Sequence, residues 1–261
     1  SYDGGLDGND FGTGIVANAA GDLYMTGQVE NAAGQGFNTM VAKLAGINGT
    51  VVWADFPNGT ANADDGGNAI TVDSAGAVIA AGFVRNSTTD DVWVRKYADT
   101  GVSFTTTWTR TYNGPGNGAD SAFGVTTDAP NAVIIAGFET TASQGANALG
   151  RKYDSAGTAM WTQTNAGAAG LNDIAYAIDV DSNGSVVVGG FISVANDTAD
   201  VWVRRYSSGG TAQWTQTFNG TSDEDDVIYG IAIDTASNVL AAGREVASGP
   251  VVNGWVRKYT P

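Results

Sequence analysis

Short apolar runs rich in β-branched and aromatic residues recur along the chain, separated by clusters of Gly, Asn and Asp. Runs of this length and composition predict β-strands. One unit of four such runs covers residues 68–72, 77–81, 92–97 and 105–111. The first two are joined by Asp73-Ser74-Ala75-Gly76, which is typical of a tight hairpin turn because Gly tolerates positive φ. The pattern predicts a small antiparallel sheet built from consecutive hairpins.

The second and third runs of this unit differ in how apolar residues are spaced. The run 77–81 is apolar at every position, which indicates that both of its faces are buried. The run 92–97 alternates, so that Trp93, Arg95 and Tyr97 share one face of the sheet. We therefore expect the second strand to be covered on both sides by neighbouring sheets.

The unit occurs five times, and several residue columns keep the same spacing. An Asp followed four positions later by Gly or Ala opens each copy, and a Gly closes each apolar second run. Both columns recur at intervals of 55, 55, 53 and 53 residues. The Asp column consists of Asp10, Asp65, Asp120, Asp173 and Asp226. Copies held in phase in this way predict a repeat architecture, in which each unit buries its faces against its neighbours.

Four-stranded antiparallel units of about 40–50 residues are typical of β-propeller blades, because radial repetition protects the strand edges. We therefore predict an all-β fold, a single five-bladed β-propeller that spans residues 1–261 as one domain. The last copy lacks a fourth strand, and residues 2–4 resemble the tail of that strand. This predicts that the N-terminal segment joins the last blade and closes the ring. The repeats cover approximately residues 5–59, 60–114, 115–167, 168–220, and 221–261 with 1–4.

The segments ITVDSAGAVIAAGF, DVWVRKYADTG and WTRTYNG resemble the bacterial propeller repeats known as SBBP repeats. The resemblance covers essentially the whole chain, although the first copy departs from it at Ala42 and Leu44. It implies an extracellular or cell-surface module of unassigned activity. The family name refers to seven blades, whereas five copies are present here.

The amino-acid composition excludes several kinds of active site and metal site. The chain has no Cys and no His, which excludes disulfides, thiolate or imidazole metal ligands and a Ser-His-Asp triad. The net charge of −15 argues against a nucleic-acid partner, because such a partner needs a basic face. No apolar run approaches the roughly 20 residues of a membrane span. We expect a bacterial secreted or cell-surface protein that is a monomer.

The Asp column has two interpretations. Five-fold repetition would place these carboxylates around one mouth of a central channel, where convergent oxygens could hold Ca²⁺. Alternatively, each Asp accepts hydrogen bonds from backbone N–H groups of its own blade. We favour the second interpretation, because a residue present in every copy is more often part of the blade itself.

Arg and Trp recur in the third strand of the copies. We expect the guanidinium groups to stack on aromatic rings and to pair with the Asp column, and the Trp side chains to pack between blades instead of binding sugars. The columns are Arg95, Arg151, Arg204 and Arg257, and Trp93, Trp202 and Trp255.

One acidic stretch breaks the symmetry of the copies. Asp223, Glu224 and Asp225 precede Asp226 in a single loop. This loop offers oxygen ligands for Ca²⁺, but its spacing fits no EF-hand, so a solvated acidic loop is the favoured interpretation. The sequence demands no cofactor.

Three functions remain open. The favoured one is a non-enzymatic binding or scaffold module, with a protein or glycan ligand at a propeller face or between blades. The first alternative is a glycoside-active enzyme that uses channel-mouth carboxylates, because glycoside hydrolysis needs two carboxylates and neither His nor Cys. The second is a structural spacer in a larger surface protein.

Overall fold

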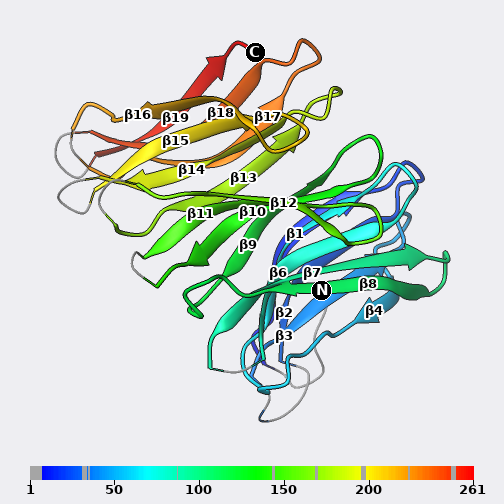
Figure 1. Cartoon of the computed structure of the whole chain (residues 1–261). Coiled ribbons are helices and arrows are strands. Elements are labelled where there is room, and N and C mark those ends of the chain that lie inside the picture. Colours follow the sequence, from blue (N-terminus) through cyan, green and yellow to red (C-terminus); the bar gives the residue numbers. More distant parts are fainter. Residues whose placement is uncertain are drawn as a thin grey trace.

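The computed structural model contains 19 β-strands and no helix in the part of the chain that it describes, which therefore holds no helix able to cross a membrane. The described residues are 8–30, 34, 36–86, 88–142, 145–167, 170–194, 198–222, 224–247 and 251–261. The strands form five antiparallel sheets that follow one another along the chain (Figure 1). The all-β prediction is confirmed.

Four sheets have four strands and the last has three, each in chain order. Sheet 1 contains β1 (Phe11–Ala17), β2 (Leu23–Val29), β3 (Asn38–Leu44) and β4 (Val51–Asp55). Sheet 2 contains β5 (Gly66–Val72), β6 (Val78–Arg85), β7 (Asp90–Asp99) and β8 (Phe104–Tyr112). Sheet 3 contains β9 (Ser121–Thr127), β10 (Val133–Thr140), β11 (Ala146–Tyr153) and β12 (Ala159–Asn165). Sheet 4 contains β13 (Ile174–Val180), β14 (Val186–Ser193), β15 (Ala199–Tyr206) and β16 (Ala212–Phe218). Sheet 5 contains β17 (Val227–Ile233), β18 (Val239–Ala247) and β19 (Val251–Tyr259).

The turn of the first hairpin begins with an Asp in sheets 2 to 5, and with Asn18 in sheet 1. In sheet 2, the Asp73 carboxylate accepts hydrogen bonds from the N–H groups of Ala75 and Ala77, both at 2.9 Å. Gly76 closes the turn at φ +84°, a conformation that an L side chain rarely adopts. The turn expected from the sequence is therefore present, and its Asp also serves in an ion pair.

Consecutive sheets pack face to face. The first strands β1, β5, β9, β13 and β17 each contact the next one in the series. We call the side of a sheet that meets the following sheet its forward face, and the opposite side its rear face. Between sheets 2 and 3, the forward face supplies Ile79, Ala81, Val92, Val94 and Trp108, and the rear face supplies Ala122, Val133, Ile135, Leu149 and Tyr153.

An aromatic pair recurs at all four junctions between sheets. A Trp of each fourth strand contacts a Tyr in the third strand of the next sheet, with ring centroids 6.0–6.1 Å apart. The pairs are Trp53–Tyr97, Trp108–Tyr153, Trp161–Tyr206 and Trp214–Tyr259. Such pairs add about 0.5–1.5 kcal/mol beyond the burial of their area. This Trp–Tyr contact therefore helps to fix how one sheet sits on the next.

Buried ion pairs lie beneath these aromatic contacts. Lys152 Nζ lies 2.7 Å from Asp128 Oδ2, and both side chains are almost fully buried. Lys152 also donates to the carbonyl of Ser208 in the next sheet, at 3.2 Å. The equivalent pairs are Lys96–Asp73, Arg205–Asp181 and Lys258–Asp234, the last of which is exposed. Sequence reasoning missed this column, although both of its members recur with the period of the repeat.

The expected ring closure is not observed. Among the described strands, β17, β18 and β19 make no packing contact with sheet 1 comparable to that between consecutive sheets. Val256, on the forward face of sheet 5, is 76% exposed, whereas its counterpart Val94 in sheet 2 is fully buried. Residues 1–4, which were expected to complete the last blade, lie outside the described residues. The described sheets therefore form an array whose two end faces are not packed on each other.

Removing Lys152 should destabilise the fold far more than removing its repeat equivalent in sheet 5. Lys152→Ala leaves the buried Asp128 carboxylate unpaired, which costs about 3–5 kcal/mol of the free energy of unfolding. Lys258→Ala breaks an exposed pair and should change the melting temperature little. Urea denaturation of both variants checks this, and equal destabilisation would show that burial of the pair is not what matters.

Asp99 joins sheets 1 and 2 through three donors. Its carboxylate accepts hydrogen bonds from Lys43 Nζ at 2.8 Å, the Tyr24 hydroxyl at 2.7 Å and Trp53 Nε1 at 3.0 Å. Burial alone would raise the pKa of Asp99, but these donors outweigh burial and lower the pKa to about 2. The folded-state pKa thus lies below the value of about 3.9 in an unfolded chain. Ionised Asp99 therefore stabilises the fold above that pH, and this contribution disappears as the pH falls toward 2.

We expect Asp99→Asn to lower the free energy of unfolding at pH 7, because its amide cannot replace the charged acceptor for Lys43. The difference from the parent protein should shrink below about pH 4, where Asp99 of the unfolded chain becomes protonated. Denaturation of both proteins across pH 2–7 measures the effect. A difference that stays constant over this range would contradict the lowered pKa.

Candidate functional site

The Asp column lies where each first strand begins, and its carboxylates bind backbone. Asp173 is 1% exposed and accepts hydrogen bonds from the N–H groups of Gly167 and Ser193. Asp65, Asp120 and Asp226 make the same two contacts, one with a residue 6 positions earlier, after the last strand of the preceding sheet, and one with a residue 20 positions later in or next to their own second strand. Asp10, in sheet 1, accepts from the N–H of Glu30 at 3.2 Å. The structure therefore places this column in the construction of each sheet.

The carboxylates of the Asp column are not clustered with one another among the described residues. Burial raises the pKa of Asp65, Asp120 and Asp173. The backbone hydrogen bonds to these carboxylates lower the pKa, but their effect is smaller than that of burial. Within the described ranges, no group of three or more Asp or Glu side chains is placed to hold a metal ion. A hard cation such as Ca²⁺ takes six to eight oxygen ligands, and the geometry here does not supply such a set.

The Arg column stacks on aromatic rings and does not contact the Asp column. The guanidinium carbons of Arg95, Arg204 and Arg257 lie 5.5–5.6 Å from the centres of the Trp93, Trp202 and Trp255 rings. Arg151 lies 4.1 Å from the centre of the Tyr112 ring in the preceding sheet. Arg95 pairs with a carboxylate, but that carboxylate is Asp55 in sheet 1, at 2.9 Å. Pairing between the Arg and Asp columns was thus the wrong prediction, because backbone N–H groups already occupy the Asp side chains.

The three Trp residues of the third strands are buried, with 1–7% of their surface exposed. Trp93 packs with Trp53 and Tyr97 in the cluster between sheets 1 and 2, and Trp202 packs in the cluster between sheets 3 and 4. Trp255 stacks on Phe218 of sheet 4, with ring centroids 5.7 Å apart. None of the three offers a ring face to a ligand.

The acidic loop is partly described. Asp223 lies outside the described residues, and Glu224 is exposed. The Asp225 carboxylate accepts a hydrogen bond from the N–H of Ala199 at 3.0 Å, which joins sheet 5 to sheet 4. Asp64 and Asn172 make the same contact at earlier junctions, at 3.0 Å. All three side chains are exposed, and Asn172 and Asp225 line the same pocket, in which Asp225 supplies a carboxylate where Asn172 has an amide.

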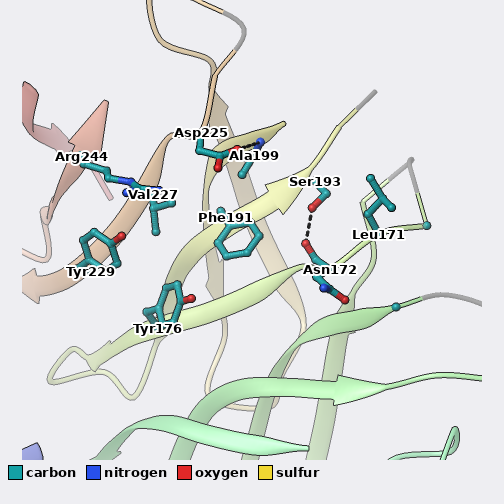
Figure 2. Close-up of a pocket in the computed structure, with 12 residues that line it drawn as sticks. Leu171, Asn172, Tyr176, Phe191, Ser193, Ala199, Asp225, Val227, Tyr229 and Arg244 are labelled. Carbon is teal, nitrogen blue, oxygen red and sulfur yellow. Dashed lines mark hydrogen bonds between the residues drawn. The ribbon is translucent and has the colours of Figure 1, made fainter. Parts of the chain in front are cut away.

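That pocket, of about 490 Å³, lies between sheets 4 and 5 (Figure 2). Its walls include three aromatic rings, from Tyr176 on β13, Phe191 on β14 and Tyr229 on β17. The Tyr176 ring centroid lies 5.7 Å from that of Tyr229 and 6.0 Å from that of Phe191. Tyr229 is 55% exposed, so more than half of its surface is accessible to solvent. Burial raises the pKa of Tyr176, which keeps its hydroxyl neutral and able to donate.

Arg244 supplies a positive charge to the same pocket and breaks the repeat. The equivalent residue is Gln28 in sheet 1, and it is a Phe in sheets 2–4, namely Phe83, Phe138 and Phe191. Arg244 Nε is buried and has no hydrogen-bond partner. Burying an N–H group without an acceptor costs free energy, because the group loses its hydrogen bonds to water. The Nε–H of Arg244 at the pocket wall is therefore suited to donate a hydrogen bond to a ligand oxygen.

The sequence contained a signal for this site that sequence reasoning missed. Three positions after the column Asp, the residues change from Thr13 and Asn68 to Phe123, Tyr176 and Tyr229. The aromatic side chains of later copies therefore line up along neighbouring first strands, and they end beside Arg244. Positions that depart from the repeat, and not those that keep it, mark this site.

Comparison with known proteins supports the fold. No protein-family model matches the chain, and no curated protein matches it. A protein of unknown function from Dyadobacter fermentans superposes with a TM-score of 0.56 at 10% identity, covering 93% of this chain and 74% of that one. An α-L-arabinanase of Penicillium chrysogenum, complexed with arabinobiose, superposes with a TM-score of 0.52 at 10% identity, covering 95% and 92%. The GH93 α-L-arabinofuranosidase of Fusarium graminearum gives 0.51 at 9%, covering 95% and 92%.

The chain has a β-propeller-like fold, as its structural neighbours do. At 9–10% identity the likeness shows the fold alone, and it does not support the SBBP type in particular. The favoured prediction of a non-enzymatic binding or scaffold module is contradicted by these neighbours, which are glycoside-active enzymes.

Asp173→Ala should lower the free energy of unfolding without involving a metal. The substitution leaves the N–H groups of Gly167 and Ser193 buried and unpaired, at about 1–3 kcal/mol each. Thermal unfolding of the parent protein should be unchanged by EDTA or by added CaCl₂. A melting temperature that falls with EDTA would contradict the assignment of this column to backbone binding, since a bound ion stabilises by mass action.

Proposed function

We propose that this protein acts on the glycosidic bonds of a polysaccharide, and that the pocket between sheets 4 and 5 binds the sugar. The observation that carries the proposal is the exposed side chain of Tyr229, which lines one pocket together with Asp225 and Arg244. Rigid apolar rings with a few convergent polar groups are the usual lining of a small-molecule site. A sugar ring offers an apolar face for the aromatic rings and hydroxyl groups for the polar side chains.

The carboxylates of this site differ from those expected from the sequence. Asp65, Asp120, Asp173 and Asp226 are buried and bonded to backbone, so they are unsuited to acid–base chemistry at a channel mouth. Asp225 is the carboxylate on the pocket wall among the described residues, and Glu224 precedes it in the same exposed loop. Glycoside hydrolysis uses two carboxylates on either side of the scissile bond. We assign one of these roles to Asp225.

Arg244 contributes to substrate binding in this proposal. Its buried Nε would donate to a sugar oxygen, and a guanidinium can also bind a carboxylate with two hydrogen bonds. The substrates to compare are therefore neutral arabinan, xylan and fructan, and acidic polygalacturonate. An extracellular or cell-surface location remains part of the proposal, because such polymers are met outside the cell.

The proposal predicts release of reducing ends from at least one of these four polymers. Asp225→Asn should lower the rate at least about 100-fold, which is the lower range of a general acid–base contribution, with little change in melting temperature because its side chain is exposed. Lack of activity on every polymer, together with lack of binding to any of them, would contradict the proposed function.

The aromatic wall can be tested against a matched control. Tyr229→Ala should weaken polysaccharide binding in titration calorimetry by roughly tenfold, the equivalent of 1.4 kcal/mol. Phe11→Ala removes a ring of similar exposure, 49%, whose centroid also lies 5.7 Å from its partner, but in sheet 1. This control should bind normally. Equal loss of binding in both variants would show that the effect is not due to the pocket.

A further inference from the structure

Every first strand contains a β-bulge at the same repeat position, three residues after the column Asp. At this position one residue of the first strand has no partner on the second strand. A bulge re-aims the side chain of its extra residue, and bulges are common next to active sites. The fold therefore sets one side chain per sheet apart from the alternation of its strand. The five bulge residues are Thr13, Asn68, Phe123, Tyr176 and Tyr229.

In sheets 1 and 2 the bulge residue is polar and is hydrogen-bonded to the following sheet. The Thr13 hydroxyl donates to the carbonyl of Gly67 at 2.5 Å. The side-chain amide of Asn68 donates to the carbonyl of Ala122 at 2.9 Å. Both junctions form with a polar residue at the bulge. The stacking of one sheet on the next therefore does not require an aromatic residue at this position.

In sheets 3 to 5 the bulge residue is aromatic, and the three rings form a row across neighbouring first strands. The Phe123 ring centroid lies 5.2 Å from that of Tyr176, which lies 5.7 Å from that of Tyr229. Phe123 is half-buried between the buried residues Ala122 and Gly124, so the bulge turns its side chain away from the core. Tyr176 is likewise half-buried between two buried Ala residues. We call these three rings the bulge row.

The bulge row begins in the pocket and continues beyond it toward sheet 3. Tyr176 and Tyr229 line the pocket between sheets 4 and 5 (Figure 2). Phe123 continues the row on β9, the first strand on the other side of β13. Phe138 of β10 adds a further ring, with its centroid 5.8 Å from that of Phe123. Because each step along the row is about the width of one sugar ring, the row is longer than a single sugar unit.

We propose that the bulge row binds consecutive sugar units of one polysaccharide chain, and that Phe123 and Phe138 form a second sugar subsite next to the pocket. This inference rests on the proposed function, because the pocket supplies the first subsite. A sugar ring places its apolar face on an aromatic ring, so successive rings hold successive units. The pocket has Asp225 and Arg244 beside its rings, whereas the second subsite is built from aromatic rings. The pocket therefore selects the sugar, and the second subsite adds affinity for a longer chain.

The dependence of binding on chain length tests this inference. The probes are oligosaccharides of arabinan, xylan, fructan and polygalacturonate, from the disaccharide to the hexasaccharide, in titration calorimetry with the whole chain. For the sugar that binds, the affinity should rise roughly fivefold from the disaccharide to the tetrasaccharide, which is within the contribution of one aromatic contact. Equal affinity at every length would overturn the inference and leave sugar binding in the pocket intact. Lack of binding at every length would overturn both.

Variants at Phe123 show whether the second subsite is the source of this gain. Phe123→Asn introduces the residue that sheet 2 already accommodates at its bulge, and Phe123→Leu keeps an apolar side chain for packing. Both should bind the disaccharide as the parent does and lose the gain in affinity for longer chains. Phe83→Ala is the matched control, since Phe83 is the half-buried counterpart of Phe138 in sheet 2 and lies outside the bulge row. It should keep the gain, and folded Phe123 variants that also keep it would overturn the inference.

Discussion

The stacking of each sheet's forward face on the next sheet's rear face is the constraint on which this architecture depends. A single four-stranded sheet with two apolar faces cannot be stable in water, so each copy needs its neighbours. The repeated Trp–Tyr contact aligns successive sheets, as does the hydrogen bond that the backbone N–H of Asp65, Asp120, Asp173 and Asp226 donates to a carbonyl next to or in the third strand of the preceding sheet. Buried Lys–Asp pairs satisfy polar groups beneath those contacts. These features recur because every junction poses the same packing problem.

The same constraint separates structural residues from candidate functional ones. Positions that keep the repeat, such as Asp173 and Trp202, are used for backbone binding and for packing. Positions that break the repeat lie where no junction dictates the residue. Tyr229 and Arg244 are of this kind, and both line the pocket between sheets 4 and 5. The functional proposal therefore rests on residues at which the copies differ.

The strands, the hairpin turns and the five copies could be predicted from the sequence, because they follow from local alternation, Gly at positive φ and a constant period. Whether the ring closes could not be predicted from the sequence, because the angle between successive sheets depends on side-chain packing across each junction. Matching the opposite charges in the sequence predicted an Arg partner for the Asp column. In the structure, two backbone N–H groups already donate to the carboxylate of Asp173. The pocket was not predicted because the sequence analysis considered residues shared by the copies, and Arg244 is not shared by them. The non-enzymatic prediction was overturned by structural neighbours that sequence comparison does not reveal.

Hydrogen exchange of the second strands tests the stacking most directly. The amides of β6, β10 and β14 are covered on both faces and should exchange slowest, near the rate set by global unfolding. The β18 amides, whose strand is covered on one face, should exchange measurably faster. Equal protection of β18 and β14 would contradict the account, because it would mean that both faces of the last sheet are covered within a single copy.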